Sequence, residues 1–426
     1  MVGAYVFVLL GLFMAAVPVA FALGGTSIVI TILERGFPFN TAFMVQKAVS
    51  GIDNFMLLSV PFFIYAGKVM NVGGVTVRIY AFAKALVGSL RGGLAQVNVV
   101  ASVIFAGMTG TAVSEAAGLG TVVIKSMREE GYDEDFAVAV VAASSTIGPI
   151  IPPSVPLVIY ALMANVSVGG ILIAGLIPGL LMGLSLMLWI AMIAKRKNLP
   201  SGAPFSLPTV WQTFRDGFFP LLTPILLIGG IVSGVFTPTE AAAIAALYAT
   251  FLSVVVYRAV SFADLVEIMR STVVDTGVIM LVVSMAMIYG YLVTRAGLTD
   301  AMVVWMAGVS TDPTVIGLLI IGFLLIVGCF LEATAAIIVL TPVLLPIMVA
   351  SGLDPLHMGV IIVLTMMIGL LTPPFGMVLF VLSRISGISL YRIVVAVLPF
   401  IVPLLIVTVL LLLVPPLVTF LPGIVM

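Results

Sequence analysis

From Phe136 to Ala194 the chain contains no charged residue, and most of this run is apolar. A helix crosses the hydrocarbon core of a bilayer with about 20 residues. A run of this length must therefore turn inside or at the edge of a membrane. Hydrophobic residues make up 62% of the chain and charged residues only 8%. Because water would not tolerate this much apolar surface, lipid must be the solvent for most of the chain. The sequence therefore predicts an all-α polytopic membrane protein.

Apolar stretches long enough to cross a membrane recur along the whole chain, and we expect about 10 to 12 passes. The first stretch lacks the basic start of a cleaved signal peptide, so we expect a retained helix there. The predicted spans are 4–33, 55–70, 79–105, 136–164, 168–194, 218–235, 239–258, 272–293, 314–330, 357–383 and 391–421. Two further stretches, 107–124 and 328–346, carry small and polar residues and are less like simple spans.

Few side chains of this chain can support covalent or metal chemistry. One His, His357, and one Cys, Cys329, exclude a disulfide framework and a His/Cys metal cluster. Basic and acidic residues balance at 17 each, whereas a nucleic-acid partner requires a basic footprint. We therefore expect neither an enzyme, nor a catalytic residue, nor a cofactor, nor a nucleic-acid partner. The sequence has no phosphate-binding loop of the Walker type, so any transport by this chain should be driven by an ion gradient and not by ATP hydrolysis.

A basic, Pro- and Gly-containing segment that begins at Lys195 divides the chain near its middle. Short basic loops stay in the cytoplasm. We therefore predict a first half at 1–194, a cytoplasmic linker at 195–217 and a second half at 218–426.

Over about fifty residues the two halves align without a gap when the first is shifted by 221 residues, and further upstream the shift is 223. The matched pairs are Gly107 with Gly328, Ala112 with Ala333, Gly131 with Gly352, Asp133 with Asp354, Gly148 with Gly369, Pro152 with Pro373 and Pro153 with Pro374. Chance is the alternative, because the chain has 41 Gly and 25 Pro, but a fixed offset argues against it. Paired repeats with broken helices are typical of secondary transporters, whose binding site lies where the breaks meet.

The charges of the two equivalent turns indicate that the repeats are inverted. The turn at 125–135 holds Lys125 and Arg128, whereas its counterpart at 346–356 holds neither Lys nor Arg. This asymmetry is typical of turns on opposite sides of a membrane.

The segment 105–120 interleaves hydroxyl residues with glycines. Glycine permits an unwound or re-entrant backbone, and hydroxyl and carbonyl oxygens suit a hard cation such as Na⁺. The alternative is helix packing through small residues. Glu115 fits three roles: a cation ligand, a proton site or a solvated charge at a helix end.

Four prolines and a glycine lie between Gly148 and Pro156, and they cannot form a continuous helix. A broken backbone leaves carbonyls unpaired, which the membrane tolerates only at a cavity or a binding site. A tight surface turn is the alternative, against which the charge-free flanks argue. The break recurs at 366–376, and its free helix ends could hold a cation and an anion.

Several charged residues stand out from this apolar background. Glu332 is the only charged residue between Pro313 and Gly352, so it is either functional or a helix-end carboxylate that reaches the interface. Lys68, Asp53 and Asp275 are either substrate or gating charges, or interfacial residues. The segment Thr237-Pro-Thr-Glu240 predicts a helical capping box.

At these segments the chain closely resembles the large membrane subunit of TRAP (tripartite ATP-independent periplasmic) transporters, the DctM-type family. The resemblance covers essentially the whole chain. The stretches that carry it are Val17–Gly24, Val60–Gly67, Arg91–Asn98, Phe105–Gly120, Ile147–Pro156, Gly234–Glu240 and Gly369–Gly376. One departure is Thr109-Gly-Thr111 with Glu115, where the family often has Ser-Gly-Ser and Asp. Ligation of a cation by the backbone does not depend on these side chains. The departure therefore puts only a direct role of the side chains in doubt.

The resemblance implies an inverted-repeat, elevator-type transporter with two re-entrant hairpins near 105–125 and 328–346. It implies Na⁺ sites at Gly107, Thr109, Thr111, Gly148, Ile151 and Pro153, and at Gly328, Glu332, Thr334, Met366, Gly369 and Thr372. The substrate would lie between these sets, in a region that we assign to Ser114, Ser145, Pro152, Pro373 and Pro374.

The resemblance also implies a function and partners. The chain would be the large subunit of a Na⁺-coupled importer for an organic anion in the bacterial inner membrane. It would work with a small four-helix DctQ-type membrane subunit and a periplasmic DctP-type substrate-binding protein. The carboxylate would be a dicarboxylate or a sialic acid. The alternative is a stand-alone Na⁺-coupled anion symporter or a Na⁺/H⁺ antiporter. A channel or a membrane-embedded enzyme is the hypothesis from a different functional class.

Overall fold

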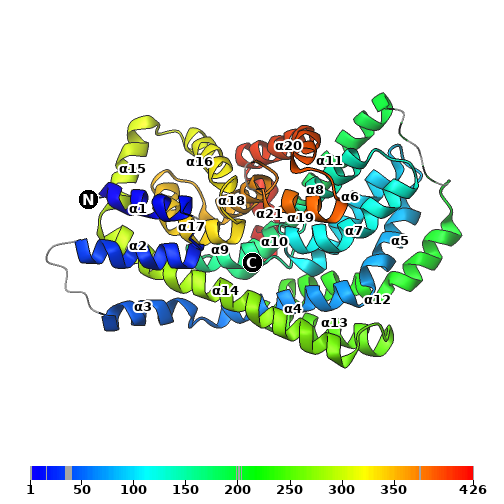
Figure 1. Cartoon of the computed structure of the whole chain (residues 1–426), viewed down its shortest axis with the longest axis horizontal. Coiled ribbons are helices and arrows are strands. Elements are labelled where there is room, and N and C mark those ends of the chain that lie inside the picture. Colours follow the sequence, from blue (N-terminus) through cyan, green and yellow to red (C-terminus); the bar gives the residue numbers. More distant parts are fainter. Residues whose placement is uncertain are drawn as a thin grey trace.

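The secondary structure of the first half consists of short and medium helices separated by frequent breaks (Figure 1). The computed structural model describes residues 2–15, 17–33, 41–197, 199, 202, 204–373 and 376–425. The helices of the first half are α1 (Val2–Met14), α2 (Val19–Leu33), α3 (Thr41–Ile52), η1 (Phe55–Leu58), α4 (Ser59–Val72), α5 (Val75–Val87), α6 (Gly93–Thr109), α7 (Ala112–Glu129), α8 (Glu134–Ser145), α9 (Val155–Ala164), α10 (Val168–Ala174) and α11 (Leu176–Lys197).

The second half adds the longest helix of the described chain, α14. Its helices are α12 (Leu207–Val232), α13 (Pro238–Phe251), η2 (Leu252–Val256), α14 (Phe262–Arg295), α15 (Leu298–Val309), α16 (Pro313–Gly328), α17 (Ala333–Ala350), α18 (Pro355–Gly369), α19 (Met377–Ser386), α20 (Leu390–Leu413) and α21 (Pro416–Val425). The predicted linker 195–217 overlaps both neighbouring helices, because α11 continues to Lys197 and α12 begins at Leu207.

Seven helical segments of the described chain are long and apolar enough to cross a membrane, and others are apolar but shorter. Several stretches expected as single spans are broken in two. The span 136–164 is α8 and α9, 357–383 is α18 and α19, and 391–421 is α20 and α21. The prolines in these stretches remove backbone donors, and hydropathy along the chain does not register that loss.

The segments that the alignment matched have the same local structure. A shift of 221 residues carries α7, Ala112–Glu129, onto α17, Ala333–Ala350. The same shift carries the turn glycine Gly131, with φ of +80°, onto Gly352, with φ of +74°. The next residue but one, Asp133 or Asp354, is the N-cap of the helix that follows. The predicted capping box of Thr237 and Glu240 at the start of α13 is also confirmed.

Two equivalent helices, α8 and α18, form the centre of the molecule (Figure 1). Every residue of α8 from Phe136 to Ser145 is buried, and so is every residue of α18 from His357 to Gly369. Helices that are apolar on all sides belong in a core, where other helices cover them. The broken segment after α8, residues 146–154, is buried as well, whereas Pro373 in the segment after α18 is exposed.

The elements around this centre pack across the two halves. Each half has a helical hairpin, α6 with α7 in the first and α16 with α17 in the second. The helix after each Pro-Pro break packs against the second helix of the other half's hairpin, so that α9 contacts α17 and α19 contacts α7. A second group is formed by α14, which packs along α2, α3 and α4, and by α13, which packs on α4. Figure 1 shows α14 running along the lower side of the molecule.

Candidate functional site

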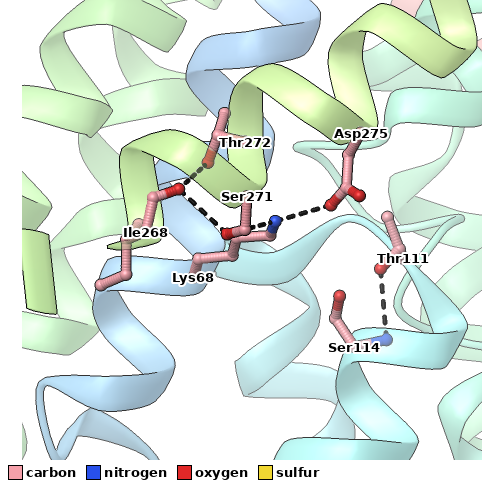
Figure 2. Close-up of polar contacts among 7 residues, drawn as sticks. All are labelled: Lys68, Thr111, Ser114, Ile268, Ser271, Thr272 and Asp275. Carbon is pink, nitrogen blue, oxygen red and sulfur yellow. Dashed lines mark hydrogen bonds and ion pairs between the residues drawn. The ribbon is translucent and has the colours of Figure 1, made fainter. Parts of the chain in front are cut away.

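The turn between α6 and α7 is the first helix break. Gly110 adopts a φ of +62°, and Thr111 is the N-cap of α7. The hydroxyl of Thr111 accepts a hydrogen bond from the Ser114 amide at 3.3 Å (Figure 2). A Cβ at Gly110 would lie 2.7 Å from the carbonyl oxygen of Pro153. The hairpin break is therefore packed directly against the Pro-Pro break.

The segment between α8 and α9 is the second break of this half. Pro149 supplies no backbone N–H, so the carbonyl of Ser145, the last residue of α8, loses its helical donor. Ser154 starts the next helix: its hydroxyl accepts a hydrogen bond from the Leu157 amide at 3.1 Å and donates one to the Pro149 carbonyl. Residues 146–154 are all buried. Ser145 is buried, so its carbonyl oxygen is available to a cation.

Glu115 of α7 faces this broken segment. The residue is only 1% exposed, and neither carboxylate oxygen has a hydrogen-bond partner among the described residues. A Cβ at Gly148 would lie 2.4 Å from its Oε2. The Ser102 side chain lies beside the carboxylate without the geometry of a hydrogen bond. Because an isolated buried carboxylate is costly, Glu115 is suited to binding a cation or a proton.

The second half brings its two breaks together more closely still. A Cβ at Gly369 would lie 2.6 Å from the Cα of Gly328, so the two backbones are in contact. The methyl carbon of Met366 would be 3.5 Å from a Cβ at Gly328. These three predicted residues therefore share one site, at the C-terminal ends of α16 and α18. Free carbonyls at helix C-terminal ends carry partial negative charge.

Glu332 lies in the same region but has a structural partner. It is the N-cap of α17 and accepts a hydrogen bond from the Ala335 amide at 2.9 Å. Thr111 holds the equivalent position in the first half. The equivalent of Glu115, in turn, is Ala336. The two hairpins therefore carry their carboxylates one helical turn apart, and the two candidate sites are chemically different.

The other predicted residues contribute unequally to these breaks. Gly107 approaches the Pro152 carbonyl, but the Cβ that it lacks would first meet Pro224 of α12, at 2.4 Å. The side chain of Ile151 packs on Gly179, so only its backbone faces the break. The hydroxyl of Ser145 donates to the Ala142 carbonyl within α8, and that of Thr372 donates back to the Ile368 carbonyl of α18.

The remaining predicted positions are placed as follows. Thr334 is half-buried in the first turn of α17, Pro373 is exposed, and the backbone of Thr109 ends α6. Pro374 lies outside the described residues. Glu115 was not included in the predicted ion-binding set, although it is the only charged residue between Arg91 and Lys125. That isolation is the sequence signal that could have included it.

Comparison with known proteins places the chain in one family. The family model of the tripartite ATP-independent periplasmic transporter, DctM component, matches residues 6–417. The sialic acid TRAP transporter large permease SiaM of Vibrio cholerae is 44% identical over 96% of this chain and 95% of its own length. A dicarboxylate TRAP large permease, DctM of Pseudomonas aeruginosa, is 37% identical over 87% of this chain and 86% of its own.

Solved transporter structures share the fold at low sequence identity. The YdaH transporter of Alcanivorax borkumensis aligns with a TM-score of 0.66 at 14% identity, over 94% of this chain and 96% of that one. MtrF of Neisseria gonorrhoeae aligns with a TM-score of 0.62 at 11% identity, over 95% and 94%. The chain is thus an integral membrane protein of the DctM family, the large permease subunits of TRAP transporters.

Proposed function

We propose that this chain is the translocating large subunit of a Na⁺-coupled TRAP importer for an organic carboxylate in the bacterial inner membrane. Relatives named for the transport of sialic acid, a dicarboxylate and 2,3-diketo-L-gulonate support a carboxylate as the solute. We expect sialic acid first, since that relative is 44% identical. The solute would arrive on a DctP-type periplasmic binding protein, and a DctQ-type membrane subunit would complete the complex.

The observation that carries the Na⁺ site is the unpartnered carboxylate of Glu115 against the first broken helix. Its charge and the carbonyl oxygens around Gly148 and Pro153 form the kind of all-oxygen set that hard cations prefer. In the second half, the carbonyls at Gly328 and Gly369 would hold a second ion. A bound cation would offset the negative charge that gathers at the helix C-terminal ends.

The solute would bind between the two sets, near Ser114, Ser145, Pro152, Pro373 and Pro374. Helices α7, α9, α17 and α19 all begin at the breaks, and the N-terminal ends of helices favour anions. Na⁺ bound nearby would lower the cost of bringing a carboxylate into the membrane, which couples the two fluxes. In an elevator cycle, the hairpins and broken helices would move as one unit against α4, α13 and α14.

The test is uptake into liposomes that contain this chain and its small subunit. Uptake of labelled sialic acid and of succinate is measured with and without an inward Na⁺ gradient, and with and without the binding protein. The proposal predicts uptake only when both are present. Uptake driven by Na⁺ without a binding protein would instead establish the stand-alone symporter. Uptake that is indifferent to the Na⁺ gradient would overturn the coupling.

A further inference from the structure

A charged pair joins α4 and α14 beside the first hairpin (Figure 2). The ammonium of Lys68 lies 2.6 Å from Oδ2 of Asp275 and donates a second hydrogen bond to the Ser271 hydroxyl at 2.9 Å. The hydroxyl of Ser271 donates to the Ile268 carbonyl, so its lone pairs face the ammonium. An ammonium has three N–H donors, and the described residues give acceptors to two. One donor of Lys68 is therefore available to a ligand.

The pair is open on one side. The side chain of Lys68 is 24% exposed and that of Asp275 is 53% exposed. Asp275 is the only charged residue of α14 between Arg270 and Arg295, and Lys68 is the only one in α4. An exposed carboxylate on a membrane-spanning helix is costly in lipid, so the open side requires water or a polar partner. Exposed ion pairs stabilise a fold little, so stability alone does not account for this pair.

The first hairpin packs next to this open side. Helix α4 contacts both α6 and α7. A Cβ at Gly118 of α7 would lie 2.5 Å from the side chain of Asn71, which is less than one turn from Lys68 on α4. Figure 2 draws Lys68 and Asp275 in one view with Thr111 and Ser114 of the first hairpin. Helix α4 therefore carries the ammonium beside the hairpin at which the proposed solute would bind.

We infer that Lys68 is a solute-binding residue that pairs with the carboxylate of the transported acid, while Asp275 and Ser271 hold its ammonium in position before the solute arrives. The inference rests on the proposed function and names a specificity-determining charge for the same site. Asp275 is an internal competitor: its carboxylate occupies the position that the carboxylate of the solute takes over. The carboxylate of the solute forms a charge-assisted hydrogen bond with the free donor and then displaces Asp275.

Kinetics of the reconstituted complex test this inference with labelled sialic acid, or with succinate if the wild type takes up only that acid. Lys68→Gln should raise KM by about tenfold or more, because one charge-assisted hydrogen bond to the solute is lost. It should leave kcat within about twofold of the wild-type value. Asp275→Asn should lower KM, because the competitor is gone. Lys84→Gln, which breaks the exposed pair of Lys84 on α5 with Glu130 at the end of α7, should leave KM unchanged.

The charge-reversed double variant Lys68→Asp with Asp275→Lys separates binding from structure. Both residues remain paired, so the melting temperature should match that of the wild type, yet KM should stay as high as in Lys68→Gln. Wild-type KM in the double variant would show a purely structural pair and overturn the inference. The methyl ester of sialic acid should compete poorly with the acid in the wild type, and this preference should shrink in Lys68→Gln.

The outcomes distinguish this inference from the proposed function. Na⁺-dependent wild-type uptake with an unchanged KM in Lys68→Gln overturns the inference alone. Failure of the wild type to take up either acid overturns both. If Lys68→Gln does not fold, Asp275→Asn decides: a lower KM supports the inference, and an unchanged or higher KM with a lower melting temperature overturns it.

Discussion

Gly328 and Gly369 contact each other through their backbones, with the Cα of Gly328 2.6 Å from where a Cβ of Gly369 would stand. They are 41 residues apart in the chain. One ends the first helix of a hairpin and the other ends the helix before a Pro-Pro break. The contact brings two helix C-terminal ends, and therefore their partial negative charges, to one place.

Gly369→Ala is expected to separate these helix ends. The added methyl must push against backbone, so we expect a loss of about 1–3 kcal/mol in unfolding free energy and the loss of Na⁺-dependent uptake. Thermal unfolding of the purified protein and the liposome assay measure the two effects. Gly322→Ala on α16 is the control, since a Cβ there meets nothing within 4 Å. It should be neutral or stabilising by up to about 1 kcal/mol, and wild-type uptake in Gly369→Ala would contradict the close contact.

Glu115→Gln is expected to weaken Na⁺ binding. Gln keeps the size of the side chain but not its charge, so the affinity for Na⁺ should fall at least about tenfold, or about 1.4 kcal/mol. The melting temperature is measured against Na⁺ concentration with choline as the replacement ion, because a bound ion stabilises the folded state. Glu129→Gln, an exposed position at the end of the same helix, should respond to Na⁺ as the wild type does. An unchanged Na⁺ response in Glu115→Gln would remove the carboxylate from the ion site.

Two substitutions at Glu332 distinguish its role as the N-cap of α17 from a role in binding Na⁺. Glu332→Ala removes the acceptor for the Ala335 amide and should cost about 1 kcal/mol of unfolding free energy. Glu332→Gln keeps an acceptor oxygen and should retain most of that stability. If the charge also binds Na⁺, only the Na⁺ response should fall in Glu332→Gln. A normal Na⁺ response in Glu332→Gln would leave Glu332 with the capping role alone.

Arg392→Gln is expected to have a small, salt-sensitive effect. The guanidinium of Arg392 on α20 donates from Nε to Oδ2 of Asp135 at 3.0 Å, and its Nη2 lies 2.8 Å from Oδ1. The pair is partly exposed, so its loss should cost less than about 1 kcal/mol, and the cost should shrink in high salt. Thermal unfolding in low and high potassium chloride measures this. A larger loss that persists in high salt would indicate a buried structural pair.

The sequence repeat predicted the fold better than hydropathy did. The fixed shift of 221 residues matched α7 to α17, residue for residue. It also matched the two turn glycines and the two aspartate caps, because glycine and capping residues mark local backbone geometry. Hydropathy instead merged α8 with α9 and α20 with α21, since a proline break does not change the apolar content of a stretch.

The candidate site was predicted only in part. Gly148, Gly328 and Gly369 were named from the sequence, and the structure places each against another break or its carboxylate. Glu115 was left with three possible roles, because its burial and lack of partners are properties of the packed molecule. Lys68 and Asp275 are 207 residues apart, and no periodicity could pair them.

The sequence by itself determined that this chain belongs in lipid, that it is duplicated and where its helices break. These properties follow from composition, from a fixed offset and from proline and glycine, all of which act locally. Only the tertiary structure decided which breaks meet, that Glu115 is buried with no hydrogen-bond partner among the described residues, and that Lys68 pairs with Asp275. Those relationships depend on how distant helices pack, and burial and pairing of charges exist only after that packing.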